Sequence, residues 1–262
     1  MHPRMPLYLR ELFFSPLVPE PLRILFCGSD AFSCASLRAL HARLGSLVEA
    51  LDVMVLPGRR VGRGPGVVRQ VPCRVLAQEL GLRVYERETF RGWELPRGTN
   101  LVVAVSFGLF VPSRILASAR YGGLNVHPSL LPDLRGPAPI HHALLRGDTH
   151  MGVSLQTLDD KAFDHGTILA QTPAPGFPIP PSASLQTITH EAATRGAEML
   201  IRGLEKNLHV PPRHDAGWKA ADLRARGVDT LQHAPKITKA DSRIEPAWTA
   251  EQFARRVRVL GS

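Results

Sequence analysis

The chain has 262 residues, of which 44% are hydrophobic and 21% charged. This composition is ordinary for a globular protein and excludes disorder of the whole chain, while three cysteines do not supply a disulfide framework. Lysine and arginine number 32 against 23 acidic residues, which gives a formal net charge of +9. Such a basic excess favours contact with a polyanion such as nucleic acid, with solubility as the alternative explanation. No apolar run reaches the length of a membrane span, so we expect no membrane partner.

The first 22 residues stand apart from the rest of the chain. They carry Arg4 and Arg10 but also Glu11 and Glu20, around an apolar group at 12–14. Transit peptides are amphipathic, rich in arginine and poor in acids, and this segment meets part of that description. We expect residues 1–22 to be a leader or a disordered tail. The leader-like composition favours the mitochondrial matrix, with a bacterial cytoplasm as the alternative.

Strand-like apolar runs then alternate with helical patterns. Strands are predicted at 23–28, 48–56, 82–85, 101–106, 122–127, 152–158 and 168–172, and helices at 32–44, 71–80, 139–145, 187–204 and 250–260. This alternation predicts an α/β fold, an open and mostly parallel sheet with helices on both faces. Ligands on such sheets bind beyond the carboxyl ends of the strands.

A basic loop interrupts the pattern at 57–69. Arg59, Arg60, Arg63 and Arg69 lie there among four glycines, without any apolar period. Arginines on a flexible loop can reach a nearby phosphate backbone. A solvated surface loop without a partner is the alternative interpretation.

Polar side chains gather where the predicted strand at 122–127 ends. Asn125 and His127 are two residues apart, so they point to the same side of a strand. An asparagine amide can donate to a developing oxyanion, and a histidine can carry a proton or act as an electrostatic partner near neutral pH. A polar strand end with a satisfied histidine is the structural alternative, and these two residues alone favour it.

A second candidate is Asp164, within Phe-Asp-His-Gly at 163–166. A carboxylate beside a tight turn could hold His127 in orientation and stabilise its charged form. It could also simply make the turn, and in isolation that is the simpler interpretation.

Together these residues resemble a known family. The segment at 125–132, Asn-Val-His-Pro-Ser-Leu-Leu-Pro, and the segment at 135–140, Arg-Gly-Pro-Ala-Pro-Ile, are similar to the signature of the 10-formyltetrahydrofolate-dependent formyltransferases. Asp164 falls where that family has its catalytic aspartate. The resemblance runs from about residue 23 to the C-terminus. It implies a formyltransferase-type fold, with Asn125, His127 and Asp164 as catalytic residues.

The same resemblance implies the ligands of the site. The co-substrate would be 10-formyltetrahydrofolate, and no metal would be needed. The implied cofactor-binding residues fall in two groups, one after the strand at 101–106 and one after Pro128: Phe107, Gly108 and Leu109, then Ser129, Leu130, Leu131 and Pro132.

Three features resemble the branch of the family that formylates methionyl-tRNA. One is the form of the segment at 135–140. Another is the basic loop, which resembles an inserted loop that touches tRNA, so that its four arginines would be tRNA contacts. The third is the segment at 236–244, which resembles the start of that branch's C-terminal domain. The implied partners are initiator methionyl-tRNA and the folate, with the protein as a monomer.

We therefore expect a catalytic domain at 23–207, followed at 208–262 by a linker and an incomplete C-terminal tRNA-binding domain. Two alternatives stay open. One is a formyltransferase acting on a small amine, either glycinamide ribonucleotide or an amino-sugar nucleotide. The other is a non-catalytic module that binds folate or tRNA.

Overall fold

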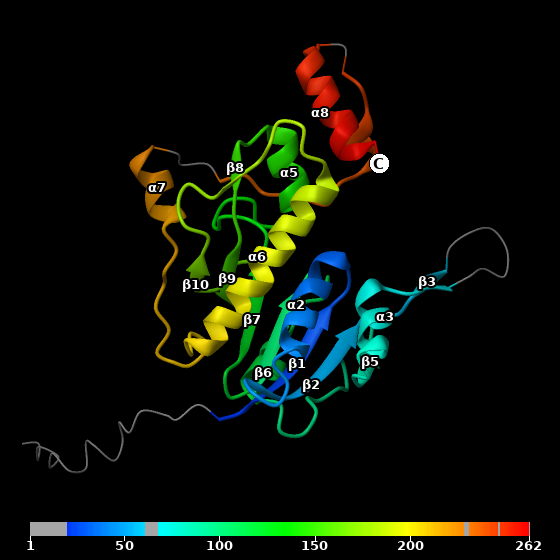
Figure 1. Cartoon of the computed structure of the whole chain (residues 1–262), viewed down its shortest axis with the longest axis vertical. Helices are drawn as coiled ribbons and strands as arrows, with labels where there is room; N and C mark the ends of the chain where they lie inside the picture. Colours follow the sequence, from blue (N-terminus) through cyan, green and yellow to red (C-terminus); the bar gives the residue numbers. More distant parts are fainter. Residues whose placement is uncertain (1–19, 61–67, 228–230, 246, 262) are drawn as a thin grey trace, which may run out of the picture.

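A seven-stranded sheet forms the centre of the molecule (Figure 1). The computed structural model describes residues 20–60, 68–227, 231–245 and 247–261. The strands are β1 (Leu22–Gly28), β2 (Val48–Val55), β5 (Val84–Glu86), β6 (Leu101–Val105), β7 (Gly123–His127), β9 (Ser154–Thr157) and β10 (Ile168–Gln171), in the spatial order β10-β9-β7-β6-β1-β2-β5. The first five run parallel, whereas β9 is antiparallel to both β7 and β10. The predicted α/β class and mostly parallel sheet are confirmed.

The helices surround this sheet and extend beyond it. They are α2 (Ala31–His41), α3 (Pro72–Glu79), α4 (Ser113–Ser118), α5 (Pro139–Arg146), α6 (Leu185–Glu205), α7 (Lys219–Ala225) and α8 (Ala250–Leu260), with a 3₁₀ turn at Lys239–Ser242. The sequence did not predict α4 and α7, because helices of six and seven residues are too short to show an apolar period. The five predicted helices are all present.

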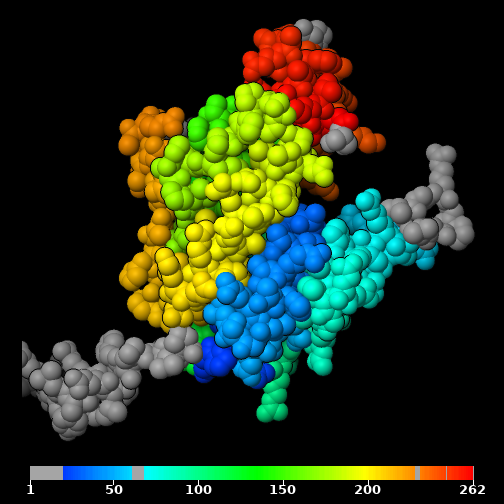
Figure 2. Space-filling view, in the orientation of Figure 1, coloured from blue at the N-terminus to red at the C-terminus, as the bar shows by residue number. Residues whose placement is uncertain are grey.

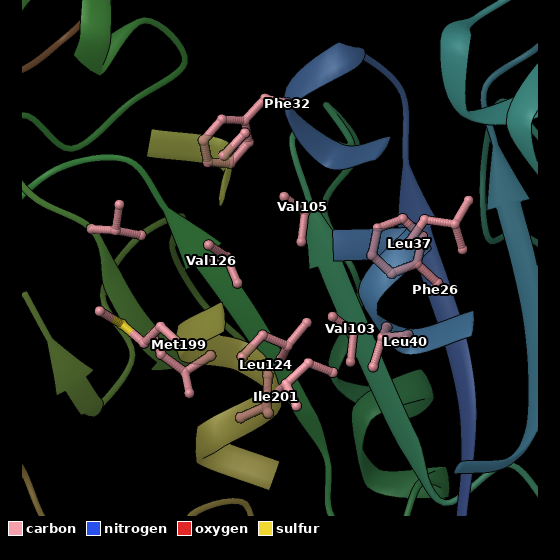
Figure 3. Packing of buried hydrophobic residues seen from close by; sticks show 14 of the residues in the cluster. Phe26, Phe32, Leu37, Leu40, Val103, Val105, Leu124, Val126, Met199 and Ile201 are labelled. Carbon is pink, nitrogen blue, oxygen red and sulfur yellow. The ribbon is translucent and has the colours of Figure 1, made fainter. Parts of the chain in front are cut away.

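Both faces of the sheet are buried. Ile24 and Phe26 of β1 belong to the larger core cluster, which α2 and α6 cover (Figure 3). Leu25 and Cys27 point to the opposite face and pack in a second cluster with Ile115 of α4. Because side chains alternate along a strand, burial of both faces requires the unbroken apolar run that marks β1 in the sequence.

The two helices over the larger cluster start at defined caps. Asp30 accepts a hydrogen bond from Ser33 N at the start of α2, and Ser184 accepts one from Thr187 N at the start of α6. These bonds satisfy N–H groups that have no partner inside the helix. The capped helices lie side by side across this face of the molecule (Figures 1 and 2).

Two small sheets lie outside the central one. β8 (His150–Met151) pairs with β11 (Phe177–Pro178), and β3 (Arg59–Arg60) pairs with β4 (Val68–Arg69). The second pair lies within the predicted basic loop, whose two ends form an antiparallel ladder that the sequence did not predict. Main-chain hydrogen bonds hold such a ladder without any apolar period. Residues 61–67, and with them Arg63, lie outside the described residues.

The chain returns to the central sheet after α6. Arg213 Nη2 donates to Tyr121 O at 2.7 Å, and Trp218 Nε1 donates to Thr172 O at 2.7 Å. Further on, the backbone of Ala234 pairs with Arg135 and Ala138. The predicted division at 207/208 therefore separates segments that share many hydrogen bonds. Across the described parts of the chain, no helix has the length and apolar character needed to cross a bilayer.

A buried histidine makes the folded state sensitive to acid. His209 is 1% exposed and meets the ring of Tyr121 edge-on, and neither ring nitrogen finds a partner among the described residues. Burial, with Arg213 nearby, lowers the pKa of His209 from 6.5 to about 4. The unfolded chain therefore binds the proton more readily than the folded one. Stability is fully present above pH 6.5 and falls as the pH drops toward 4.

We expect His209→Phe to remove much of this acid sensitivity. The pKa difference corresponds to on the order of 3 kcal/mol, which the variant should no longer lose between pH 6.5 and pH 4. Urea unfolding at a series of pH values measures the effect, with the exposed His190→Gln as the matched control. An acid dependence in His209→Phe equal to that of the unchanged protein would contradict this assignment.

Candidate active site

A cavity of about 480 Å³ opens where several parallel strands end. β6 and β7 both end at its wall, and Asp30, two residues after β1, also lines it. The sheet order shows why the cavity lies here: the chain passes from β1 to β2 on one side, and β6 lies on the other side of β1. The carboxyl ends at such a switch in strand order leave a crevice for ligands.

Asp164 lies in this wall at the centre of a hydrogen-bonded cluster. Its Oδ1 accepts from Asn125 Nδ2 at 3.1 Å and from Gln156 Nε2 at 3.2 Å, and lies 3.3 Å from His127 Nδ1. Its Oδ2 accepts from the backbone N–H of Gly136 at 2.9 Å. The structure thus brings together the three residues predicted to be catalytic, although Asp164 lies 39 positions from Asn125 in the sequence.

His127 is held between two hydrogen-bond acceptors. Its Nδ1 faces the carboxylate of Asp164, and its Nε2 lies 3.0 Å from the carbonyl oxygen of Leu134. The Nε2 contact is a hydrogen bond when Nε2 carries hydrogen, and the Nδ1 contact is an ion pair when the ring is protonated. A protonated ring held in this way can stabilise negative charge in the cavity. With both ring nitrogens in these contacts, neither is free to take up a proton from a substrate.

The amide of Asn125 keeps one donor available. Its NH₂ group has two hydrogens, and the contact with Asp164 uses one of them. Because Asn125 lines the cavity, the other hydrogen can serve a ligand oxygen. A cavity with a fixed N–H donor and a nearby positive charge is suited to an oxyanion.

Unusual backbone conformations concentrate around this cluster. Four non-glycine residues in the described ranges have positive φ, and Ser106 (46°), Leu134 (57°) and Asp164 (59°) are three of them. Ser106 and Asp164 line the cavity, and Leu134 supplies the carbonyl that contacts His127. Backbone strain of this kind persists where the surrounding structure enforces it, and it is frequent at functional sites.

Two glycines allow the close approach of chain segments at the site. Gly136 has φ of 121°, and a Cβ there would lie 2.5 Å from Ala234 O. A Cβ on Gly166 would lie 1.7 Å from Thr157 O. The first glycine donates to Asp164, and the second lets the turn that carries Asp164 fold back on β9.

The predicted cofactor residues separate into two places. Phe107, Gly108 and Leu109 line the cavity that Asn125 also lines. Ser129 and Leu130 instead border a second cavity of about 710 Å³, and Leu131 is 1% exposed. The segment at 129–132 therefore lies beside this cavity rather than in its wall, and its role in binding the folate stays a prediction.

The physical reason lies in the backbone of that turn. In the structure, Leu131 N donates to Ser154 Oγ, and Leu131 O accepts from Gln171 Nε2. Ser129 Oγ donates to Asp133 O. The turn that includes Pro132 is thus joined to β9 and β10 and supports the site from behind.

Three residues at the site have contacts that the sequence did not predict. Gln156 looked like any residue of a predicted strand, although its pairing with Asn125 across β9 and β7 brings it to Asp164. His233 lines the cavity from the segment after α6, through a bridge with Arg135. Arg135 itself donates from Nε to Asp164 O at 2.8 Å. Only pairing between distant segments reveals these contacts.

The predicted tRNA-binding arginines lie elsewhere. Arg59, Arg60 and Arg69 are on the exposed β3–β4 ladder, which projects from one side of the molecule (Figure 1). They do not line the cavity. Their role as nucleic acid contacts stays a prediction.

Comparisons with a solved structure and with a family model define the fold and the family of this chain. A sugar 3N-formyl transferase, crystallised in the presence of dTDP and 5-N-formyl-THF, superimposes with a TM-score of 0.61 over 92% of this chain and 79% of that one. The sequences are 14% identical, so this likeness shows a shared formyltransferase fold and no more. The family model described as "Formyl transferase" matches residues 22–204. The chain belongs to the formyl transferase family.

Two curated relatives narrow the comparison. The chain is 32% identical to a protein named methionyl-tRNA formyltransferase from Acidiphilium cryptum, over 91% of this chain and 74% of that protein. It is 36% identical to a mitochondrial methionyl-tRNA formyltransferase from Bos taurus, over 92% of this chain and 57% of that protein. The chain thus spans about three quarters of the first relative and little more than half of the second.

Proposed function

We propose that this protein transfers a formyl group from 10-formyltetrahydrofolate to the α-amino group of methionyl initiator tRNA. The observation that carries the proposal is the carboxylate of Asp164, which meets Asn125, His127 and the Gly136 N–H inside the cavity. Membership of the family and similarity to proteins named methionyl-tRNA formyltransferase support the choice of reaction and acceptor.

The reaction divides among the three side chains. The neutral amine of the acceptor attacks the formyl carbon and forms a tetrahedral intermediate with an oxyanion. The free N–H of Asn125 donates to this oxygen, and the charge on His127 stabilises it further. Asp164 holds His127 charged and moves a proton from the attacking nitrogen toward N10 as the carbon–N10 bond breaks.

The size and the lining of the cavity support a folate as the co-substrate. Its volume of about 480 Å³ is within the usual range for small-molecule sites, which are mostly apolar with a few placed polar groups. Its apolar lining includes Phe107, Leu109, Val111, Leu158 and Ala162. In the proposed arrangement the pterin lies against these side chains, with the formyl group toward Asn125 and Asp164.

The acceptor arm of the tRNA would approach along the basic ladder. Arg59, Arg60 and Arg69 are exposed there, and Arg63 belongs to the residues between the two strands. In the proposed division, residues 23–207 form the catalytic domain, and 208–262 form a linker and the start of a C-terminal tRNA-binding domain. Translation initiation in the mitochondrial matrix is the proposed setting. Import of a reporter fused to residues 1–23 into mitochondria tests this location.

Formylation of competing acceptors tests the proposed function. The chain is incubated with 10-formyltetrahydrofolate and methionyl initiator tRNA, glycinamide ribonucleotide or an amino-sugar nucleotide. We expect formyl-methionine from the tRNA alone, and at least a hundredfold lower turnover in Asn125→Ala. Methionyl-tRNA with an acetylated amino group is the control, since it has no free amine. Transfer to a small amine but not to tRNA would favour that alternative, and folate binding without transfer would favour a binding module.

A further inference from the structure

Gln156 is buried beside Asp164 with only half of its amide bonded. The residue is 1% exposed, and its Nε2 donates to Asp164 Oδ1 at 3.2 Å. In the described part of the chain, no donor reaches its Oε1. The register of β9 against β7 places Gln156 opposite Asn125, so two amides meet the same carboxylate oxygen.

An unpartnered buried acceptor destabilises a folded protein. Rotating the amide would not relieve this, because Oε1 would then face the carboxylate oxygen of Asp164 at the distance where Nε2 now donates. An apolar side chain of similar length would avoid the problem altogether. In the folded state the amide of Gln156 therefore has one acceptor without a partner, and its one hydrogen bond is to Asp164.

We propose that Gln156 is a positioning residue for formyl transfer, which keeps Asp164 Oδ1 directed at His127 and Asn125 at the expense of stability. This inference rests on the proposed function of the site. Asp164 has positive φ and lies on a turn, so its side chain needs contacts from the sheet to keep one orientation. Gln156 supplies such a contact from β9, which is anchored on both sides by β7 and β10.

Gln156→Met separates positioning from folding. The variant keeps the length of the side chain and removes both the contact with Asp164 and the unpartnered oxygen. We expect kcat to fall at least tenfold, KM for folate and acceptor to change less than twofold, and the melting temperature to stay equal or rise. The acid limb of the pH–rate profile should move to higher pH, because a carboxylate with one donor fewer is protonated more readily.

Gln156→Glu gives a second, pH-dependent readout. An ionised glutamate would repel Asp164, whereas a protonated one can donate to it as the amide does. We expect turnover in Gln156→Glu to recover relative to Gln156→Met as the pH falls. A side chain with a merely structural role would not produce this recovery.

Gln171 on the neighbouring β10 is the matched control. Its Nε2 donates to Leu131 O and Ser154 Oγ, and its Oε1 accepts from Lys219 N, so both halves of the amide are bonded. Gln171→Met should lower the melting temperature and leave the pH profile of turnover unchanged.

Two results would overturn the inference. One is unchanged kcat and an unchanged pH profile in Gln156→Met. The other is a melting temperature that falls in Gln156→Met as it does in Gln171→Met, which would make Gln156 an ordinary structural amide. The second comparison needs no substrate. Absence of transfer by the unchanged protein would instead contradict the proposed function. The melting temperatures would still show whether Gln156 is an ordinary structural amide.

Discussion

Asp164→Asn is expected to lower formyl transfer by about a thousandfold, at the upper end of the losses seen when an oxyanion or acid–base group is removed. The substitution keeps the volume of the side chain, and asparagine tolerates the positive φ of this position. It removes the negative charge that faces His127 and the other three donors around the carboxylate. The positive form of His127 would then lose the carboxylate that stabilises it. In addition, no group would accept the proton of the attacking amine.

Turnover at saturating folate and the melting temperature together measure this effect. Asp160→Asn is the matched control, because Asp160 is exposed on the same β9–β10 connection. We expect full turnover in that control and unchanged folate binding in both variants. If Asp164→Asn kept turnover within tenfold of the unchanged protein, Asp164 would have no part in the proton transfer.

Gly166→Ala is expected to abolish turnover and to destabilise the protein by about 3 kcal/mol or more, as over-filled positions with backbone contacts do. A Cβ on this residue would lie 1.7 Å from the backbone oxygen of Thr157, which cannot move without disturbing β9. The turn that carries Asp164 would have to leave β9. Asp164 would then move away from the donors on the sheet.

Gly81→Ala provides the comparison. That residue has φ of 66°, and a Cβ added there would meet no described atom within 4 Å, so only its backbone conformation resists a side chain. We expect a loss of about 1–2 kcal/mol there, with turnover intact. Denaturant unfolding and formylation of both variants measure the difference. Equal stability of the two variants would show that the Gly166 turn can move at little cost.

The strands of this protein were predictable because burial of both faces leaves an unmistakable apolar run. β1 and β6 carry hydrophobic side chains at nearly every position, and their predicted bounds differ from the observed ones by one residue. The site was only partly predictable. The spacing of Asn125 and His127 shows that they point to the same side of a strand. Asp164 was favoured as a catalytic residue only by the family resemblance. The contacts of Gln156, Arg135 and His233 were not found, since no local pattern separates these residues from others of their kind.

The sequence by itself determined the α/β class and the order of the main elements, because periodicity is a local property of the chain, whereas the type of chemistry was implied by the family resemblance. Only the tertiary structure decided which predicted residues share a cavity. It brought Phe107 and Asn125 to one cavity and buried Leu131 outside the lining of that cavity. The pairing of β9 with β7 decided that Gln156 meets Asp164, and the return of the chain after α6 decided that His233 borders the site. Such contacts depend on which strands pair and in which register, and no single segment of sequence contains that information.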